Sequence, residues 1–465
     1  MKTLCLLIMY FLLIPEVTAQ TPDDVPVMTL NEYLGFVKFH HPVAKQARLT
    51  LNMAQAELMK ARGGFDPNIT IDYDRKQFEG SGYYDILNGS FKIPVWFGID
   101  IKAGFERNDG VYLNPQRTVP EDGLYSAGIS VPLGQGLFIN ERMATLKKAK
   151  LLQERTAVAR DILINQILYD AVIAYVDWFN AYNEMQIYEN VLRNAETRFK
   201  GIRQRALVGD IAAIDTVEAG IIVQNRALSL EQARIKLLKA MLEASNFLWL
   251  NNVPMELQPG IRPDPLLLEH IDNTLNINNE MPENFRLEDH PKIQSLRFKL
   301  QALEIDRRLK TEKLKPKLNV EYNFITADAG QFNSLNTNDY KVGLSFEMPL
   351  LLRKERGDLK LARLKLQDAQ FDYDLETLRL NNTITGSYQE LASFEEQLTR
   401  INAIVESYEK LVSAEERKFG FGESSVFLVN ARERSLIEAR LKQNELQTRF
   451  IKQKAALLRT LVALY

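Results

Sequence analysis

A duplicated stretch constrains the fold of this chain more than any other feature of its sequence. Residues 41–73 and residues 290–322 both begin with a His-Pro pair, and the second stretch follows the first at an offset of 249 positions. Pro67 and Pro316, near the end of each stretch, keep this offset without a gap. Solenoid repeats are only about 20–50 residues long. The sequence therefore predicts one large unit duplicated in tandem.

The N-terminus has the pattern of a secretory signal peptide. Lys2 precedes an apolar run from Leu4 to Ile14, and Val17-Thr18-Ala19 fits a small-residue cleavage site. We expect residues 1–19 to be a signal peptide, with a buried N-terminal helix as the alternative. The single cysteine, Cys5, lies in this segment, so we expect an exported chain without disulfides or a lipid anchor.

Composition narrows the classes of partner. The chain is 25% charged and 46% hydrophobic with a net charge of −2, so it lacks the basic excess of a nucleic-acid-binding protein. After the signal peptide we expect no apolar run of the roughly 18 residues that a membrane helix needs. A membrane-spanning form of this chain would therefore be a β-barrel.

Two segments alternate apolar and polar residues with a period of two. They cover residues 68–132 in the first repeat and 317–349 in the second. Segments of about 10 residues with this alternation are typical of barrel strands, although a soluble sandwich with one wet face has the same pattern. The first segment has room for four strands and the second for two. The extra hairpin falls at about residues 80–110.

Long helical hairpins follow the strands of each repeat. Residues 140–207 contain no proline, and read as one helix they extend roughly 100 Å at 1.5 Å per residue. We predict hairpins over 140–250 and 355–465, each turning at a glycine-containing tip. Shorter helices precede the strands, at residues 29–39, 42–62 and 291–314. Residues 251–289, which contain five prolines, are expected to form a linker at the equator of the molecule.

This order of elements resembles the TolC family of outer-membrane efflux proteins. The resemblance extends over essentially all of residues 20–465, as a first repeat at 20–250 and a second at 290–465. It rests on the paired spacing of several short motifs rather than on any single one. The motifs are the His-Pro pairs, the helix–strand junctions at Pro67, Pro132, Pro316 and Pro349, and the tips at Val208-Gly209-Asp210 and Phe421-Gly422-Glu423.

The resemblance implies an α+β membrane protein that works as a homotrimer. Three chains would share one transmembrane β-barrel in the outer membrane of a Gram-negative bacterium, continued by a periplasmic α-barrel. The tips, Val208, Gly209, Asp210, Phe421, Gly422 and Glu423, would contact a periplasmic adaptor protein coupled to an inner-membrane pump. The chain would then be the passive duct of a tripartite efflux or type I secretion system. The alternative is a soluble periplasmic coiled-coil scaffold without transport.

The strand count departs from the family pattern. The common pattern has four strands per protomer, whereas this chain offers six. Two interpretations remain open: an eighteen-stranded barrel with a wider lumen, or an extra hairpin that forms an extracellular or equatorial flap.

The predicted periplasmic gate also differs from the family pattern. Family members often have acidic residues just past the second tip, where this chain has Phe427, Leu428 and Asn430. Acidic residues lie past the first tip instead, at Asp215 and Glu218. We predict a closed end narrowed by Phe427 or Leu428 with Asn430, which would restrict passage by size and dewetting. In the alternative, Phe427 and Leu428 only pack the hairpin.

Catalytic chemistry is not indicated. The four histidines lack metal-ligand spacing, and no nucleophile elbow or phosphate-binding loop is present. His41 and His290 precede prolines at helix starts, where capping or packing explains them better than catalysis. We expect no enzyme activity, no cofactor and no metal.

Overall fold

The computed structural model describes residues 26–275, 286–334 and 338–463, so the predicted signal peptide lies outside the described residues. Two compact units make up this part of the chain. The tip unit comprises residues 26–41, 170–275 and 391–455, and the sheet unit comprises 42–169, 286–390 and 456–463. Each predicted repeat contributes to both units. The repeat is therefore a unit of sequence, while packing joins corresponding parts of the two repeats.

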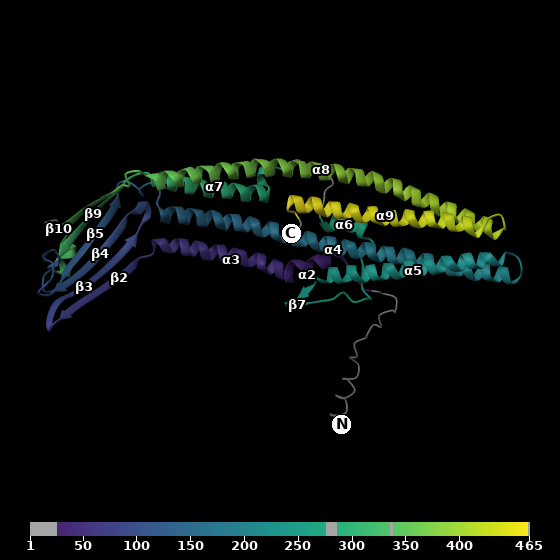
Figure 1. The fold of residues 1–465 in the computed structure, drawn as a ribbon, viewed down its shortest axis with the longest axis horizontal. Helices are drawn as coiled ribbons and strands as arrows, with labels where there is room; N and C mark the ends of the chain where they lie inside the picture. The colour runs from purple at the N-terminus through teal and green to yellow at the C-terminus, as the bar shows by residue number, and fades with distance from the viewer. Residues whose placement is uncertain (1–25, 276–285, 335–337, 464–465) are drawn as a thin grey trace, which may run out of the picture. The chain divides into compact units, whose positions relative to one another are not determined.

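The sheet unit contains one antiparallel sheet of six strands (Figure 1). Its order is β10-β9-β5-β4-β3-β2. The strands are β2 (Asn68–Phe78), β3 (Ser81–Pro94), β4 (Asp100–Asp109), β5 (Leu124–Pro132), β9 (Lys317–Thr326) and β10 (Tyr340–Glu347). The extra hairpin is β3–β4, and it is hydrogen-bonded between β2 and β5. The flap interpretation is therefore wrong for this chain.

The register of the strands gives the sheet two chemically different faces. Ile69 pairs with Phe91, Ala127 with Phe324, and Val342 with Tyr322, so apolar side chains meet across strand after strand. Alternation places the polar side chains on the other face. The apolar face comprises Ile69, Ile71, Tyr73, Leu87, Phe91, Ile101, Phe105, Tyr125, Ile129, Val320, Tyr322, Phe324, Val342, Leu344 and Phe346.

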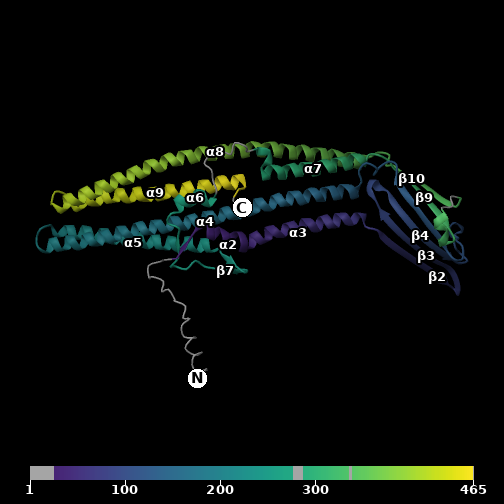
Figure 2. The ribbon, with the colours of Figure 1, turned by 180° about the vertical axis from the view of Figure 1, so that it is seen from behind.

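Four helices reach the same end of this sheet (Figures 1 and 2). They are α3 (Pro42–Arg62), α4 (Glu141–Leu207), α7 (Pro291–Glu312) and α8 (Arg353–Gly420). Within the sheet unit, Leu58 and Ala61 of α3 pack on Ala149 of α4, and Leu309 of α7 packs on Ala144. Helix α7 ends two residues before the predicted Leu314, and α8 begins two residues before the predicted residue 355.

The tip unit contains two helical hairpins. The first joins α4 to α5 (Ala213–Ser245), and the second joins α8 to α9 (Val426–Leu461). Helix α9 ends at Leu461, and Val462 after it has a positive φ of 58°. The helix was predicted to continue to residue 465, and this prediction is wrong for residues 462 and 463. Within the described residues, α4 alone has an 18-residue window apolar enough to cross a membrane, and half of that window is buried inside the protein. The expectation of no such run is therefore wrong for α4.

The remaining elements of the tip unit cover the hairpins. Helix α2 (Leu30–His40) begins with the predicted capping box, in which Thr29 and Glu32 exchange hydrogen bonds. The segment predicted as a linker contains an amphipathic helix, α6 (Leu267–Leu275), which the prolines before it obscured in the sequence. Two short ladders complete the unit: β1 (Val27–Met28) with β8 (Arg262–Pro263), and β6 (Trp249–Leu250) with β7 (Val253–Pro254).

Candidate functional site

The seam between the two repeats lies inside the sheet, where β5 of the first repeat pairs with β9 of the second. Gly128 of β5 has no room for a side chain, because an added Cβ would lie 2.0 Å from the carbonyl oxygen of Tyr322. On the polar face, Lys102 of β4 reaches across β5 and donates to Glu321 of β9 at 2.8 Å. The two repeats are thus joined by the hydrogen bonds between β5 and β9 and by the Lys102–Glu321 ion pair, which passes over Gly128.

The outer edges of the sheet are complementary in direction. Because all neighbours among the six strands are antiparallel, β2 and β10 run in opposite directions. Within the described residues, no strand pairs with the outer edge of either one. Asp72 and Asp74 share the polar face of β2, and Lys341 lies on that face of β10. Open edges such as these pair readily with another chain.

The turn of the extra hairpin is fixed to the helices of the sheet unit. The short helix η2 (Trp96–Gly98) makes this turn, and the ring of Trp96 stacks on Phe65 with 5.4 Å between centroids. Arg142 of α4 donates to Asp100 at 2.9 Å and lies over the Phe65 ring. Lys92 of β3 binds the other oxygen of Asp100 at 2.9 Å. The hairpin is therefore anchored at the helix–strand junction by specific contacts.

The four predicted junction prolines lie at strand ends. Pro67 and Pro316 directly precede β2 and β9, Pro132 is the last residue of β5, and Pro349 follows β10 by two positions. The carbonyl oxygen of Pro316 accepts from the backbone N–H of Gln135 at 2.8 Å. Proline suits these positions because it lacks the N–H that a continuing ladder would require.

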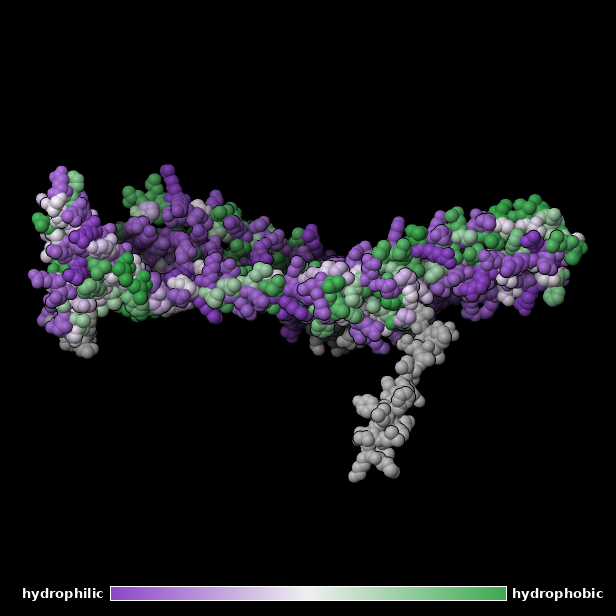
Figure 3. Space-filling view, turned by 90° about the horizontal axis from the view of Figure 1, so that it is seen from below, coloured by the Kyte–Doolittle hydropathy of each residue, from purple (hydrophilic) through white to green (hydrophobic). Residues whose placement is uncertain are grey.

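The two tips are built alike. In the first, the N–H of Gly209 bonds to Ala206 and the N–H of Asp210 to Arg205; in the second, Gly422 bonds to Phe419 and Glu423 to Lys418. These are Schellman caps, and both glycines have the positive φ of 79° that the motif requires. Val208 and Phe421 occupy the equivalent position before each glycine, and both side chains are 80% exposed. Figure 3 shows hydrophobic side chains gathered at the hairpin ends.

The predicted gate residues have different environments. Phe427 and Leu428 are 67% and 41% exposed, whereas Val426 and Val429 are buried instead. In this chain Val426 and Val429 fill the hairpin interior, and Phe427 and Leu428 lie nearer its surface. Asn430 is turned toward Arg198, whose Nη1 lies 3.4 Å from its Oδ1. Asp215 and Glu218 lie half-buried near the start of α5.

An ion cluster that the sequence did not reveal joins the two hairpins of the tip unit. Arg198 of α4 donates to both oxygens of Glu433 on α9 at 3.2 Å, and to Glu416 of α8 at 2.9 Å. Burial would lower the pKa of Arg198, but these two carboxylates raise it above its ordinary value. Arg198 therefore stays charged and connects α4 to both helices of the second hairpin.

The two histidines that open the repeats are structural. The Nδ1 of His290 accepts from the N–H of Lys292 at 3.1 Å, and its Nε2 bonds to the carbonyl of Thr460 at 2.6 Å. The ring of His41 stacks on Phe247, and burial lowers the pKa of both imidazoles. Among the described residues, no three His, Cys, Asp or Glu side chains gather in a way that could hold a metal ion.

The comparisons with known proteins agree with this architecture. Residues 286–462 match the family model described as outer membrane efflux protein. No curated protein matches the chain by sequence.

Solved structures share the fold over nearly the whole chain. The CmeC outer membrane channel of Campylobacter jejuni is 12% identical, with a TM-score of 0.65 over 94% of this chain and 86% of that one. VceC, an outer membrane protein of Vibrio cholerae, is 12% identical, with a TM-score of 0.65 over 93% of this chain and 96% of that one. The MtrE outer membrane channel of Neisseria gonorrhoeae is 13% identical, with a TM-score of 0.65 over 93% and 89%.

These findings confirm the predicted resemblance and the predicted α+β class. At 12–13% identity the solved structures establish the fold alone, and the family match covers the second repeat.

Proposed function

Residues 286–462 match the outer membrane efflux protein family, and from this match we propose that the chain is a member of that family and that three copies assemble into a passive export duct. Substrates would reach the duct from an inner-membrane pump through a periplasmic adaptor, and would leave across the outer membrane in one step. No side chain of the duct is assigned a chemical step in this proposal.

The observation that supports this function best is the six-stranded sheet with one apolar face and two open edges. A hydrocarbon environment does not tolerate unpaired strand edges. A sheet of six strands is also too narrow to close alone, since small barrels have about eight. Pairing of β2 with β10 of a neighbouring copy would remove both edges and continue the antiparallel order.

Closure by three copies would place six strands from each chain in one barrel of eighteen. Barrel diameter grows roughly linearly with strand number, so this barrel would be about half as wide again as one of twelve strands. Its polar face, with Lys102, Glu321, Asp72 and Asp74, would line the lumen, and the apolar face would contact outer-membrane lipid.

The tips would form the contact with the adaptor. Each tip presents an exposed apolar residue, a glycine in the left-handed conformation and an acidic residue: Val208-Gly209-Asp210 and Phe421-Gly422-Glu423. The equivalence of the two tips would let one adaptor surface bind at either hairpin. Phe427 and Leu428, exposed just past the second tip, would narrow the duct together with Asn430. Asp215 and Glu218 would lie just past the first tip, near the start of α5.

Disulfide formation across the proposed edges tests the assembly. Asp72→Cys on β2 is combined in turn with Lys341→Cys, Gly343→Cys and Ser345→Cys on β10, because all four positions lie on the polar face. After oxidation of membranes, at least one pair is expected to yield covalent dimers and trimers on a denaturing gel.

A pair on neighbouring strands of one chain serves as the matched control. Asn88→Cys with Glu106→Cys joins β3 to β4 and should give only a cross-linked monomer. Monomers from every edge pair, or a protein that extracts without detergent, would contradict the duct and favour a soluble scaffold.

A further inference from the structure

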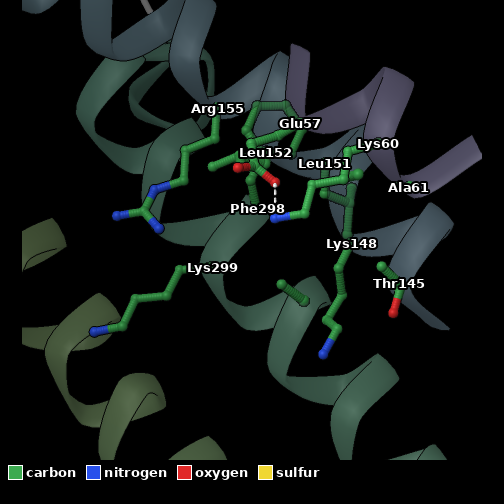
Figure 4. Close-up of a pocket in the computed structure, with 12 residues that line it drawn as sticks. Glu57, Lys60, Ala61, Thr145, Lys148, Leu151, Leu152, Arg155, Phe298 and Lys299 are labelled. Atoms are coloured by element: carbon green, nitrogen blue, oxygen red, sulfur yellow. Dashed lines mark ion pairs between the residues drawn. The ribbon is translucent and has the colours of Figure 1, made fainter. Parts of the chain in front are cut away.

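A groove on the helices of the sheet unit has an amphipathic lining (Figure 4). It lies over α4 between α3 and α7 and has a volume of about 520 Å³. Its apolar part consists of Ala61 from α3, Ala149, Leu151 and Leu152 from α4, and Phe298 and Ala302 from α7. A volume of this size holds a small organic molecule.

The charged lining of this groove is unbalanced. Four cations line it, namely Lys60, Lys148, Arg155 and Lys299, against the single carboxylate of Glu57. Three of the cations have anionic partners: Lys60 lies 3.7 Å from Glu57, Lys148 lies 3.5 Å from Asp306, and Lys299 lies 3.1 Å from Asp372.

Arg155 differs from the other three cations. Within the described residues, its guanidinium makes no hydrogen bond and no ion pair, and Figure 4 shows it beside Leu152 on the side of the groove where Lys299 lies. A guanidinium offers a planar fork of donors that matches a carboxylate or sulfonate. The groove therefore combines a guanidinium that is free to bind an anion with an apolar floor.

We propose that this groove binds a small amphiphilic anion, with its acidic headgroup on Arg155 and an apolar body against Phe298 and Leu152. The unpaired guanidinium of Arg155 selects the charge of the ligand, and the apolar floor selects its body. The claim concerns binding, and it rests on the proposed function in placing the sheet in the outer membrane.

The place of the groove along the helices favours a water-soluble amphiphile over a bilayer lipid. Leu152 and Arg155 lie 11 and 14 residues after Glu141, where α4 begins beside the sheet, or roughly 16 and 21 Å along the helix. The headgroup layer of a bilayer adds only about 5–8 Å beyond the hydrocarbon on each side. With the sheet in the hydrocarbon, the groove would open below the lipid headgroups.

Binding of a fluorescent amphiphilic anion tests this proposal. The probe is 11-(dansylamino)undecanoic acid, and the protein is the full assembly in phosphatidylcholine nanodiscs, with empty nanodiscs as the background. Saturable binding of the acid is expected, with the uncharged methyl ester at least 10-fold weaker. Arg155→Gln and Phe298→Ala should each weaken binding of the acid by about 10-fold. Lys150→Gln, an exposed charge on α4 outside the groove, should change it less than 2-fold.

Three results would overturn the proposal. One is an absence of saturable binding, and another is equal binding of the acid and the ester, which would indicate an apolar site only. The third is that Lys150→Gln weakens binding as much as Arg155→Gln, which would indicate non-specific attraction. Thr145→Cys, in the lining, tests whether the groove is open in the intact assembly. If a maleimide fails to label this cysteine there, the groove is a contact between copies, and the proposal is overturned.

Discussion

The two repeats begin alike and diverge only in the sheet. Each has a His-Pro helix start and a proline directly before its first strand, but the first repeat has four strands and the second has two. The insertion is a whole hairpin, so β5 keeps its direction and its pairing with β9, while β4 takes the place that β2 would have beside it in a two-strand repeat. Widening a sheet by hairpins preserves alternating strand directions, whereas adding a single strand would reverse them.

The tips show the opposite relationship. There the repeats keep the same Schellman cap, the same positive φ and the same apolar–glycine–acidic order, although their surrounding sequences differ. The sheet unit has tolerated a large change in one repeat, while the tips have kept one geometry. That pattern fits the proposed duct, in which the barrel would face lipid and lumen and the tips would contact the adaptor.

The largest effect should come from the seam between the repeats. Gly128→Val places its Cβ against the backbone of Tyr322 and should separate β5 from β9, at a cost of more than about 4 kcal/mol. Heat-modifiable oligomers in membranes should disappear. Gly89→Val on the interior strand β3 is the matched control, because the nearest neighbour of its added Cβ, the carbonyl oxygen of Phe105, is 3.8 Å away. Equal yields of the heat-modifiable oligomer from the two variants would show that the seam does not hold the repeats together.

Loss of the ion cluster between the hairpins ranks second. Arg198→Ala leaves the buried Glu433 without its charged partner, and should cost the α4–α9 contact about 2 kcal/mol. Amide exchange in α9 around Val429 should then accelerate roughly 30-fold. Arg440→Ala removes a more exposed pair with Glu409 and should change the exchange little. If the amides of α9 are equally protected from exchange in both variants, the ion cluster does not hold the two hairpins together.

The anchor of the extra hairpin should matter less, because Asp100 keeps a second cation. Arg142→Ala removes one ion pair and the contact with Phe65, for a cost of about 1–2 kcal/mol. The midpoint of thermal dissociation should fall by a few degrees. Arg308→Ala, an exposed pair within α7, provides the comparison and should leave the midpoint unchanged. A smaller shift for Arg142→Ala than for Arg308→Ala would argue against the anchor.

The smallest effect is a pH dependence at the start of the second repeat. Burial is the main cause that lowers the pKa of His290 below its ordinary value of about 6.5, so the folded chain favours the neutral ring. The unfolded chain takes up the proton first as the pH falls, and stability is lost below about pH 6.5. The thermal midpoint should be lower at pH 5.5 than at pH 7.5, and His290→Asn should flatten part of this slope while still capping α7. An unchanged slope in that variant would assign the titration elsewhere.

The sequence predicted those parts of the fold that local patterns determine. The 249-residue offset, the alternating strands and the proline-free helices identified the architecture, because periodicity and breakers report directly on secondary structure. The Thr29–Glu32 capping box was readable for the same reason. Helix α6 was missed because four prolines precede it, and its apolar stripe spans only nine residues.

The sequence alone did not predict which distant segments are in contact. Residues 235 positions apart form the Arg198–Glu433 pair, and residues 42 positions apart form the Arg142–Asp100 pair. A single arginine in a helix rich in charges has no local feature that distinguishes it. The same limit applies to Phe427 and Leu428, whose exposure follows from Val426 and Val429 taking the buried positions of α9.

The strand number of the assembled barrel tests the account most directly. Electron microscopy of the assembly in nanodiscs, at a resolution that separates strands, would count them in cross-section. We predict eighteen strands, with β2 of each copy paired to β10 of the next. A barrel of twelve, with β3 and β4 displaced from the wall, would contradict the account.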